Sequence, residues 1–404
     1  MNIAIIGGGA AGFFAAITAK ENFPRATITI FEKSSQFLSK VKISGGGRCN
    51  VTNGTPSIAE LVGAYPRGGK LLKRLFHRFD NRATMDWFQQ RGVPLVVDPD
   101  NRVFPESRKS QSIVDCFLKE ADRLGITLEL NCGISGLQAV PEGLVLTFSD
   151  RRRASQTFDK VIVATGGSPK RTGLAWLERL GHTIVEPVPS LFTFNLPRDE
   201  ITRLPGVGVK TATVGIAGTK FRATGPFLIT HWGFSGPVVL QLSALAARKL
   251  SELNYDCTVQ VNWVNETNEH LVLERLQRTI TTSGLRQLSR IRPFEMPERL
   301  WHFLLERCGL MLGKRWREMS RKNLNQLLQV LTADRYTMSG KTTFKEEFVT
   351  CGGVSLECVN TRTMESKVCP NLYFAGEILD IDGITGGFNF QAAWTTGFVA
   401  GTLD

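Results

Sequence analysis

The first 33 residues constrain the fold more than any other stretch of this chain. Residues 2–6 (NIAII) form a short apolar run, and residues 7–12 (GGGAAG) follow it with the spacing G-x-G-x-x-G. A helix is expected over 13–20 and a second strand over 27–31, and Glu32 stands 20 residues after Gly12. This order of strand, glycine turn, helix, strand and acid predicts a Rossmann-type dinucleotide-binding unit.

Each part of the pattern has a physical task. Gly7 permits the tight turn, Gly9 lets a pyrophosphate approach the backbone, and Gly12 lets helix and strand pack closely. The helix N-terminus offers unpaired N–H groups to the phosphates. Glu32 can accept hydrogen bonds from ribose hydroxyls and would repel a 2′-phosphate, which favours FAD or NAD over NADP. The contacts predicted from this stretch are Gly7, Gly9, Ala10, Ala11, Gly12, Glu32 and Lys33.

Composition narrows the class of protein. The 404 residues suffice for two or three domains, and no run approaches the ~18 apolar residues of a membrane span. The eight cysteines form no C-x-x-C, and the five histidines form no H-x-x-x-H, so neither a dithiol nor a metal site is predicted. Without a secretion signal we expect reduced thiols and a cytoplasmic location.

The net charge of +12 allows two interpretations of the basic surface. Basic clusters at residues 67–82, 151–153 and 314–322 can be ordinary solvated surfaces. They can also bind an anionic partner such as a carboxylate, a phosphate or RNA. Aromatic interleaving that would support base stacking is sparse apart from Trp316.

A second glycine-rich stretch follows at residues 40–53. Three glycines before an arginine and an asparagine make a backbone that can press against a planar or phosphate-bearing ligand, and Arg48 adds a forked donor. Cys49 is either a redox thiol or a packing residue. The predicted contacts are Lys40, Ser44, Gly45, Gly46, Gly47, Arg48, Cys49 and Asn50.

Later strands supply further candidates. The segment around Ile134 is expected to cover the adenine. A strand over 158–164 ends in Thr165 and Gly166, a pattern common near the nucleotide in flavoproteins with two dinucleotide-binding domains. A second G-x-G-x-x-G is missing from the sequence, so a dedicated NAD(P)H domain is not expected.

The last 60 residues return to α/β character. A strand over 372–374 ends in Gly376 and Glu377, an acid placed to grip ribityl hydroxyls. A helix over 391–401 would aim its N-terminal N–H groups at the N1–C2=O edge of a flavin ring, where negative charge builds on two-electron reduction. The predicted contacts here are Gly376, Glu377, Asp382, Gly386, Gly387, Phe388 and Asn389.

His231 is the one candidate catalytic residue. It lies in THWGFSGP (residues 230–237), and histidine is a side chain that can donate or accept a proton near neutral pH. The alternative is a histidine that braces a turn. The surrounding residues 190–264 suggest a β-rich insert, and residues 265–335 suggest helices that cap a pocket or form an interface.

At this point a family resemblance becomes specific. The motifs at residues 44–53, 230–237, 351–354, 363–367 and 375–394 look like those of the aminoacetone-oxidase-like (BaiN-like, YhiN-like) family of FAD-binding oxidoreductases. The resemblance spans the whole chain. It implies FAD contacts at Gly7, Gly9, Gly12, Glu32, Lys40, residues 44–50, Thr165, Gly166, Gly376, Glu377 and residues 386–389. It also implies one FAD domain built from both ends of the chain, with a β domain and a helical domain inserted.

The sequence thus predicts an α/β fold: a Rossmann-like FAD-binding domain (1–189 and 345–404), a β-rich insert (190–264 with 336–344) and a helical domain (265–335). The predicted function is transfer of two electrons between NAD(P)H or a small organic substrate and an acceptor through non-covalent FAD. No membrane association is expected, and the oligomeric state stays open. The rivals are an RNA-modifying flavoprotein that uses the basic surface and a non-catalytic flavin-binding protein.

Overall fold

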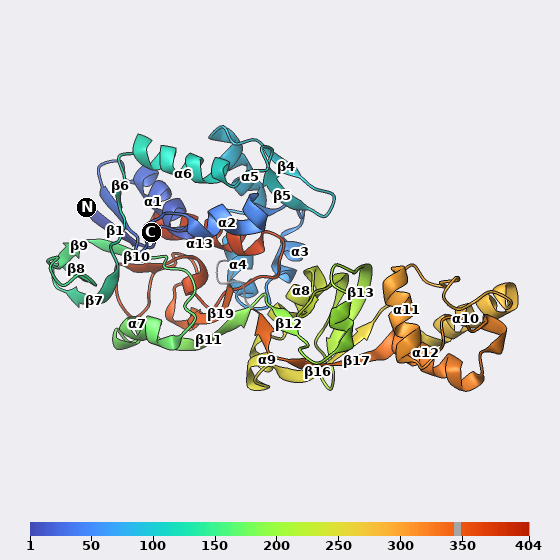
Figure 1. Ribbon diagram of the computed structural model, residues 1–404. Coiled ribbons are helices and arrows are strands. Elements are labelled where there is room, and N and C mark those ends of the chain that lie inside the picture. Colours follow the sequence, from blue (N-terminus) through green and yellow to red (C-terminus); the bar gives the residue numbers. More distant parts are fainter. Residues whose placement is uncertain (343–348, 404) are drawn as a thin grey trace. The chain divides into compact units, whose positions relative to one another are not determined.

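The computed structural model describes residues 1–342 and 349–403 and divides the chain into two compact units. Unit 1 comprises residues 1–190 and 345–404, and unit 2 comprises residues 191–344. Unit 1 is therefore assembled from both ends of the sequence, whereas unit 2 is a continuous stretch (Figure 1).

A five-stranded parallel sheet forms the centre of unit 1. Its order is β20-β10-β1-β2-β6, with β1 in the middle, and the strand bounds are β1 (Asn2–Ile6), β2 (Thr27–Phe31), β6 (Thr127–Glu129), β10 (Lys160–Val163) and β20 (Leu372–Phe374). The chain first builds β1, β2 and β6 in one direction and then crosses to β10 on the other side of β1. This reversal creates a crevice at the carboxyl ends of β1 and β10, where such sheets bind ligands.

Two helices from opposite ends of the sequence pack together in unit 1. They are α1 (Ala10–Asn22) and α13 (Phe388–Thr402), and both are buried along most of their length. A Cβ added at Gly397 would lie 2.7 Å from the carbonyl oxygen of Ala11, and one at Gly401 would lie 2.6 Å from that of Ala15. The two helices therefore approach so closely that only glycine fits at these contacts.

Smaller elements complete unit 1. Asp80 caps α5 (Asn81–Gln90), since its Oδ1 accepts a hydrogen bond from the backbone N–H of Ala83 at 2.8 Å. Three small antiparallel sheets have the orders β3-β5-β4, β7-β8-β9 and β11-β19. The elements are α2 (Ser39–Gly47), β3 (Thr52–Asn53), α3 (Ile58–Gly63), α4 (Gly69–Leu75), α5 (Asn81–Gln90), β4 (Leu95–Val97), β5 (Arg102–Pro105), α6 (Gln111–Arg123), β7 (Ile134–Val140), β8 (Gly143–Phe148), β9 (Gln156–Phe158), η1 (Arg171–Leu174), α7 (Ala175–Arg179), β11 (Ile184–Ser190), β19 (Val349–Val354), η4 (Leu356–Cys358) and η5 (Gly376–Ile378).

Unit 2 contains a seven-stranded antiparallel sheet of order β17-β16-β13-β14-β15-β12-β18. Its strands are β12 (Thr193–Asn195), β13 (Gly208–Ile216), β14 (Arg222–Ile229), β15 (Gly233–Ser235), β16 (Asp256–Asn262), β17 (Asp334–Ser339) and β18 (Lys341–Thr342). Its helices are η2 (Glu200–Arg203), α8 (Pro237–Leu245), α9 (Ala247–Glu252), α10 (Glu269–Ser283), α11 (Glu298–Arg307), η3 (Trp316–Glu318) and α12 (Arg321–Ala333).

One apolar core joins the sheet of unit 2 to its helices. Trp263 from the sheet side and Trp301 and Trp316 from the helical side belong to the same buried cluster. Trp316 is fully buried, so the one aromatic residue noted as a possible base-stacking partner is a core residue instead. The predicted division of this region at residues 264 and 336 stays a prediction.

Candidate cofactor-binding site

The glycine turn lies at the carboxyl end of β1, and its three glycines have different surroundings. A Cβ at Gly7 would lie 2.4 Å from the carbonyl oxygen of Ala164, and one at Gly12 would lie 1.9 Å from that of Gly7. A Cβ at Gly9 would meet no protein atom within 4 Å. Gly7 and Gly12 are thus required by the protein's own packing, whereas Gly9 faces open space.

The first turn of α1 is arranged to receive an anion. The helix begins at Ala10, three residues earlier than expected, with Gly9 as its N-cap. Glycine has no side chain to cap the helix, and the first turn holds no acidic residue. The N–H groups of Ala10 and Ala11 therefore stand at a bare, electropositive helix terminus beside the open space at Gly9.

Glu32 holds the neighbouring loops. One carboxylate oxygen accepts from the N–H of Gly8 and the other from the N–H of Ser34, both at 2.8 Å. Its backbone oxygen accepts from the N–H of Cys132 at 2.7 Å, which brings the start of β7, with Ile134, next to Glu32 and Lys33. The residues predicted to surround the adenosine are thus gathered at one end of the sheet.

The triple-glycine segment is the next part of the site. Gly45, Gly46 and Gly47 have φ of 57°, 66° and 80°, which interrupts α2 at Ser44. A Cβ at Gly46 or Gly47 would meet no protein atom within 4 Å. The backbone at both residues is therefore accessible to a ligand, as predicted for a loop that faces one. The guanidinium of Arg48 lies over the ring of Phe104, 5.1 Å from its centre.

Cys49 is a packing residue in this structure. Its side chain is fully buried, and burial raises the pKa of the thiol to about 12 despite a hydrogen bond with Ser44. A thiol reacts as the thiolate, so this environment makes Cys49 a poor redox group at neutral pH.

Asn50 connects the triple-glycine segment to the last helix. With its amide oriented so that Nδ2 donates to the carbonyl oxygens of Thr52 and Val103, its Oδ1 accepts from the N–H of Gly387 at 3.0 Å. Gly387 is the N-cap of α13, and a Cβ there would lie 2.4 Å from the carbonyl oxygen of Thr52. The helix therefore starts at Phe388 rather than Gln391, directly against the first segment.

Glu377 gathers a third group of predicted residues. Its carboxylate accepts from Lys40 Nζ and from the N–H of Thr350, both at 2.9 Å. A Cβ at Gly167 would lie 2.5 Å from the same carboxylate, while one at Gly166 would meet nothing within 4 Å. Lys40, Glu377 and the loop containing Thr165, Gly166 and Gly167 thus converge, and a Cβ at Gly376 would touch Ala11 of α1 at 2.8 Å.

Asp382 is placed differently from its neighbours. It is fully buried, and its carboxylate accepts hydrogen bonds from Arg67 and from Ser190 Oγ. Burial raises the pKa of Asp382, and the bonds from Arg67 and Ser190 offset part of that rise. Asp382 therefore braces the turn before α13, and its direct contact with a ligand stays a prediction.

Three more polar side chains hold the turn before α13, and two of them, Asn53 and Tyr65, were not singled out from the sequence. Asn53 Nδ2 donates to the carbonyl oxygen of Gly386 at 3.1 Å, and the hydroxyl of Tyr65 donates to that of Phe388 at 2.7 Å. The Asn389 side chain exchanges two bonds of 2.9 Å with the backbone of Gly383. Of these two, only Asn53, inside the SGGGRCNVTN motif, carried a local sequence signal, whereas Asn389 was among the predicted contacts.

His231 belongs to unit 2. Its side chain is exposed, and its ring meets that of Trp232 edge to face at 4.4 Å. Trp232 Nε1 in turn donates to Thr193 Oγ1 at 3.0 Å, which fixes the turn. The catalytic role of His231 stays a prediction. Within residues 1–342 and 349–403, no group of three or more His, Cys, Asp or Glu side chains is positioned to hold a metal ion.

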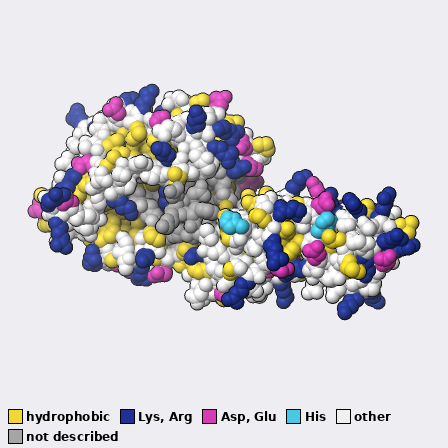
Figure 2. Space-filling view, viewed as in Figure 1, with side chains coloured by type: hydrophobic (Ala, Val, Ile, Leu, Met, Phe, Trp, Pro, Cys, Tyr) yellow, Lys and Arg dark blue, Asp and Glu magenta, His cyan; other side chains and the backbone are white. Residues whose placement is uncertain are grey.

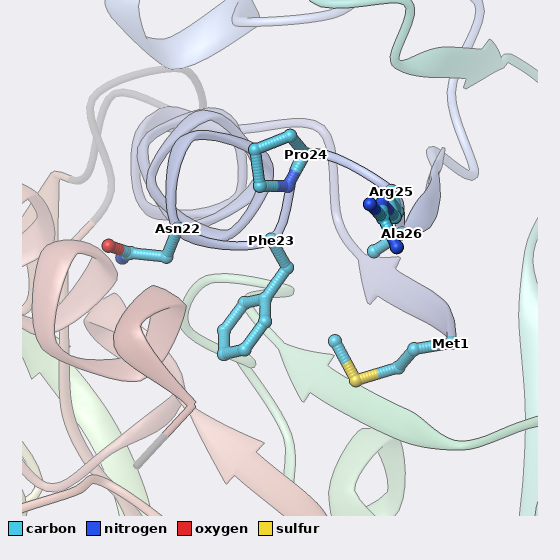
Figure 3. A pocket seen from close by; sticks show the side chains of 6 residues that line it. All are labelled: Met1, Asn22, Phe23, Pro24, Arg25 and Ala26. Carbon is cyan, nitrogen blue, oxygen red and sulfur yellow. The ribbon is translucent and has the colours of Figure 1, made fainter.

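Unit 1 also has a hollow that lies apart from the candidate cofactor-binding site. Figure 3 shows it between the end of α1 and the start of β1, lined by Met1, Asn22, Phe23, Pro24, Arg25 and Ala26. These residues lie at the amino ends of β1 and β2, the opposite edge of the sheet from the glycine turn. Its lining also contains no acidic side chain that could hold a ribose.

A parallel sheet with a glycine turn and a bare helix N-terminus at its carboxyl edge defines a Rossmann-type nucleotide-binding protein. The sequence matches the HI0933-like protein Rossmann domain family over residues 1–403, so the chain belongs to that family. The family expected from the motifs, and the α/β fold with its parallel sheet, are thereby confirmed.

Three proteins illustrate what the chain is similar to. It is 26% identical over 407 residues to 3-dehydro-bile acid delta(4,6)-reductase of Clostridium scindens, covering 99% of this chain and 98% of the relative. It is 28% identical over 404 residues to ribosomal RNA dihydrouridine synthase of Haemophilus influenzae, covering 98% and 96%. Its fold matches 3-ketosteroid delta1-dehydrogenase of Sterolibacterium denitrificans with a TM-score of 0.54 at 11% identity, covering 99% and 98%.

Among the described helices, none is both long and apolar enough to cross a membrane.

Proposed function

We propose that the protein is an FAD-dependent oxidoreductase. The observation that carries this proposal is a set of four glycines, Gly9, Gly46, Gly47 and Gly166, at which an added Cβ would meet no protein atom within 4 Å. They belong to three separate loops of unit 1, all within the stretches predicted to contact FAD. Positive φ accounts for glycine at Gly46, Gly47 and Gly166, whereas Gly9 has φ of −97° and needs glycine for neither its conformation nor its packing. What the four share is an open backbone that a ligand can approach closely.

The residues present fit a dinucleotide that carries a flavin. The bare N-terminus of α1 would hold the pyrophosphate, and Glu32 the adenosine ribose, since a carboxylate has acceptor capacity beyond its two backbone bonds. Glu377 and Lys40 would hold the ribityl chain, and the N-terminus of α13 would favour negative charge on the ring. When bound, the flavin would supply two-electron chemistry that no side chain of the protein can provide.

The names of the relatives indicate a class of reaction. A delta(4,6)-reductase and a dihydrouridine synthase both produce a ring in which a carbon–carbon double bond has gained two hydrogens. In the proposed overall reaction, NAD(P)H loses a hydride and becomes NAD(P)⁺. That hydride and one proton from the medium add across the double bond of the substrate. The protein would orient the substrate double bond and supply the proton path.

The test is anaerobic reduction of the purified protein. We expect a yellow protein whose visible flavin absorbance is lost on mixing with NADPH or NADH and returns on addition of a substrate with an activated double bond. A colourless protein that takes up no FAD would contradict cofactor binding. A yellow protein that neither nicotinamide reduces would instead support the non-catalytic flavin-binding alternative.

A second level of the proposal concerns the substrate, and here we favour a uracil ring in RNA over a free small molecule. The chain carries a net charge of +12, with 49 basic and 37 acidic residues. Two relatives, from Haemophilus influenzae and Escherichia coli, are ribosomal RNA dihydrouridine synthases, and the latter is 27% identical over 402 residues. The rates at which ribosomal RNA and a bile-acid enone reoxidise the reduced flavin decide between the two substrate classes.

A further inference from the structure

Two segments of unit 2 are joined by a short antiparallel ladder of backbone hydrogen bonds, and η3 lies in the second of them. The N–H of Leu288 donates to the carbonyl oxygen of Lys314 at 2.8 Å, and the N–H of Trp316 donates to that of Arg286 at 3.1 Å. Gln287 and Arg315 are paired as an antiparallel bridge between these bonds. We call residues 284–292 and 312–322 together the basic ladder.

The ladder is rigid because its inward side chains are core residues. Leu288 and Trp316 are fully buried. The rings of Trp316 and Trp301 stack at 6.2 Å with 16° between their planes, and Trp301 Nε1 donates to the carbonyl oxygen of Leu288 at 2.8 Å. The outward side chains of the ladder are therefore presented on a fixed backbone.

The outward side chains are strongly basic. Six arginines of the ladder are exposed, and within the described part of the chain none of them takes part in a salt bridge: Arg286, Arg290, Arg292, Arg315, Arg317 and Arg321. The one acidic residue of the ladder is Glu318, and its carboxylate accepts from the backbone N–H of Arg315. Figure 2 shows Lys and Arg side chains outnumbering Asp and Glu at this end of unit 2.

In the ladder the arginines without a salt bridge are gathered in two short segments, whereas several exposed arginines elsewhere have a carboxylate partner. Arg108, Arg152 and Arg171 are also exposed, yet each is paired with a nearby carboxylate. Arg321 and Lys322 occupy the first turn of α12, where the helix dipole disfavours cations. Clustered like charges at such positions cost stability, so the fold itself gives no reason for them.

Two apolar side chains accompany the arginines. Leu285 is 67% exposed and Met311 is 77% exposed, the two highest values among the large apolar side chains of the described residues. Leu285 precedes Arg286, and the carbonyl oxygen of Met311 accepts from the N–H of Lys314. Cations beside exposed apolar groups suit a ligand with phosphates and flat, unstacked rings.

We propose that the basic ladder binds the sugar–phosphate backbone of the RNA substrate, with Leu285 and Met311 against unpaired bases. The inference rests on the RNA reading of the proposed function. Arginine favours phosphate because its planar fork can donate two parallel hydrogen bonds to one phosphate group. A cluster of six such forks on a rigid support gives several contacts along one strand without reading its sequence.

The test compares two triple variants of the full-length protein loaded with FAD. R286Q/R290Q/R317Q removes three charges from the ladder. R25Q/R151Q/R179Q removes three charges from exposed arginines of unit 1 that likewise have no salt bridge in the described residues. Both variants change the net charge equally. Binding of a fluorescein-labelled RNA hairpin with uridines in its loop is measured while salt rises from about 50 to about 200 mM.

We expect the ladder variant to bind the hairpin about tenfold more weakly or worse, with a salt slope smaller by about 2 to 3. The unit 1 variant is expected to keep wild-type affinity and slope. Equal affinities for the two variants overturn the inference. So does binding of polyglutamate, or of phosphatidylserine vesicles, as tight as binding of RNA, because the ladder would then be a general anion surface.

The outcomes separate this inference from the proposed function. Flavin content and reduction by NADPH without RNA are measured for every variant. A wild-type protein that is yellow and reducible but binds RNA no better than polyglutamate overturns the ladder assignment alone. A protein that takes up no FAD overturns the oxidoreductase, whatever the hairpin measurement gives.

Discussion

Lys40 Nζ lies 2.9 Å from a carboxylate oxygen of Glu377, although the two residues are 337 positions apart. The pair joins the segment that follows the second strand of the sheet to the segment that precedes the last helix. Both residues were predicted to contact the same ligand, and their ion pair shows that the two segments reach the same place. The pair thus gives a direct way to test the ribityl assignment.

We predict that Glu377→Gln weakens FAD binding about tenfold or more with little effect on folding. A hydrogen bond from FAD to the charged carboxylate would contribute about 1.5–3 kcal/mol to binding. Loss of the exposed ion pair with Lys40 would cost only about 1 kcal/mol of stability or less. The measurement is FAD affinity from flavin fluorescence together with the melting temperature.

Glu178→Gln is the matched control, because Arg171 and Glu178 form a pair of similar side-chain exposure, 49% and 30% against 48% and 20% for Lys40 and Glu377. Unchanged FAD affinity in Glu377→Gln would show that this carboxylate does not hold the cofactor.

Gly9→Ala and Gly12→Ala should separate ligand binding from folding. At Gly9 the backbone is extended, with φ of −97°, and a Cβ meets no protein atom within 4 Å. At Gly12 a Cβ would stand 1.9 Å from the carbonyl oxygen of Gly7. We expect Gly9→Ala to keep the wild-type melting temperature and lose FAD affinity about tenfold or more, equivalent to 1.4 kcal/mol per tenfold.

Gly12→Ala should instead destabilise the protein by about 3 kcal/mol, because the overlap must be relieved by moving backbone. Urea unfolding and FAD titration measure both effects. If Gly9→Ala binds FAD like the wild type, the pyrophosphate does not lie against Gly9.

Asp382→Ala should be among the most damaging single changes in unit 1. The substitution leaves the largely buried Arg67 without its carboxylate, and breaking a buried pair from one side costs about 3–5 kcal/mol. The double variant R67M/D382A should recover part of that loss, since an apolar replacement of both partners is often close to neutral. Urea midpoints of the two variants check this, and a double variant less stable than D382A would contradict it.

The buried Cys49 thiol should make the folded protein less stable as the pH becomes alkaline. Its thiol pKa is 9.0 in the unfolded chain and rises to about 12 in the folded protein. Above about pH 9 the unfolded chain releases this proton first, so the free energy of unfolding falls as pH rises towards 12. One such group changes the slope by at most about 1.4 kcal/mol per pH unit.

The check is urea unfolding of the wild type and Cys49→Ala between about pH 8 and pH 10.5. The variant should lose stability less steeply with pH, whatever its stability at pH 8. Parallel curves would show that the Cys49 thiol ionises as readily in the folded protein as in the unfolded chain.

The sequence allowed the parallel sheet and the glycine turn to be predicted because their signals are local. Gly7, Gly12 and Glu32 lie within one βαβ unit, and their tasks follow from backbone geometry at fixed spacing. The helix starts were misplaced by three residues at both α1 and α13, since glycine N-caps lack the side-chain signal that marks most helix starts.

The supporting contacts of the site could not be predicted in the same way. Asp382 is braced by Arg67, 315 residues away, and Asn50 by Gly387 in the last segment. Such pairings depend on how distant segments meet in three dimensions, and no local pattern specifies which residues will be partners. The same holds for Trp316, whose place in a basic stretch suggested exposure although its ring belongs to the core.

The close packing of α1 against α13 has a consequence for biosynthesis. The ribosome produces α1 hundreds of residues before α13, an interval on the order of tens of seconds. Throughout that interval the face of α1 that receives Gly397 and Gly401 has no partner, so unit 1 cannot complete its folding until α13 has been made. A polypeptide cut short by a premature stop codon would expose that face permanently and become a target for proteolytic quality control.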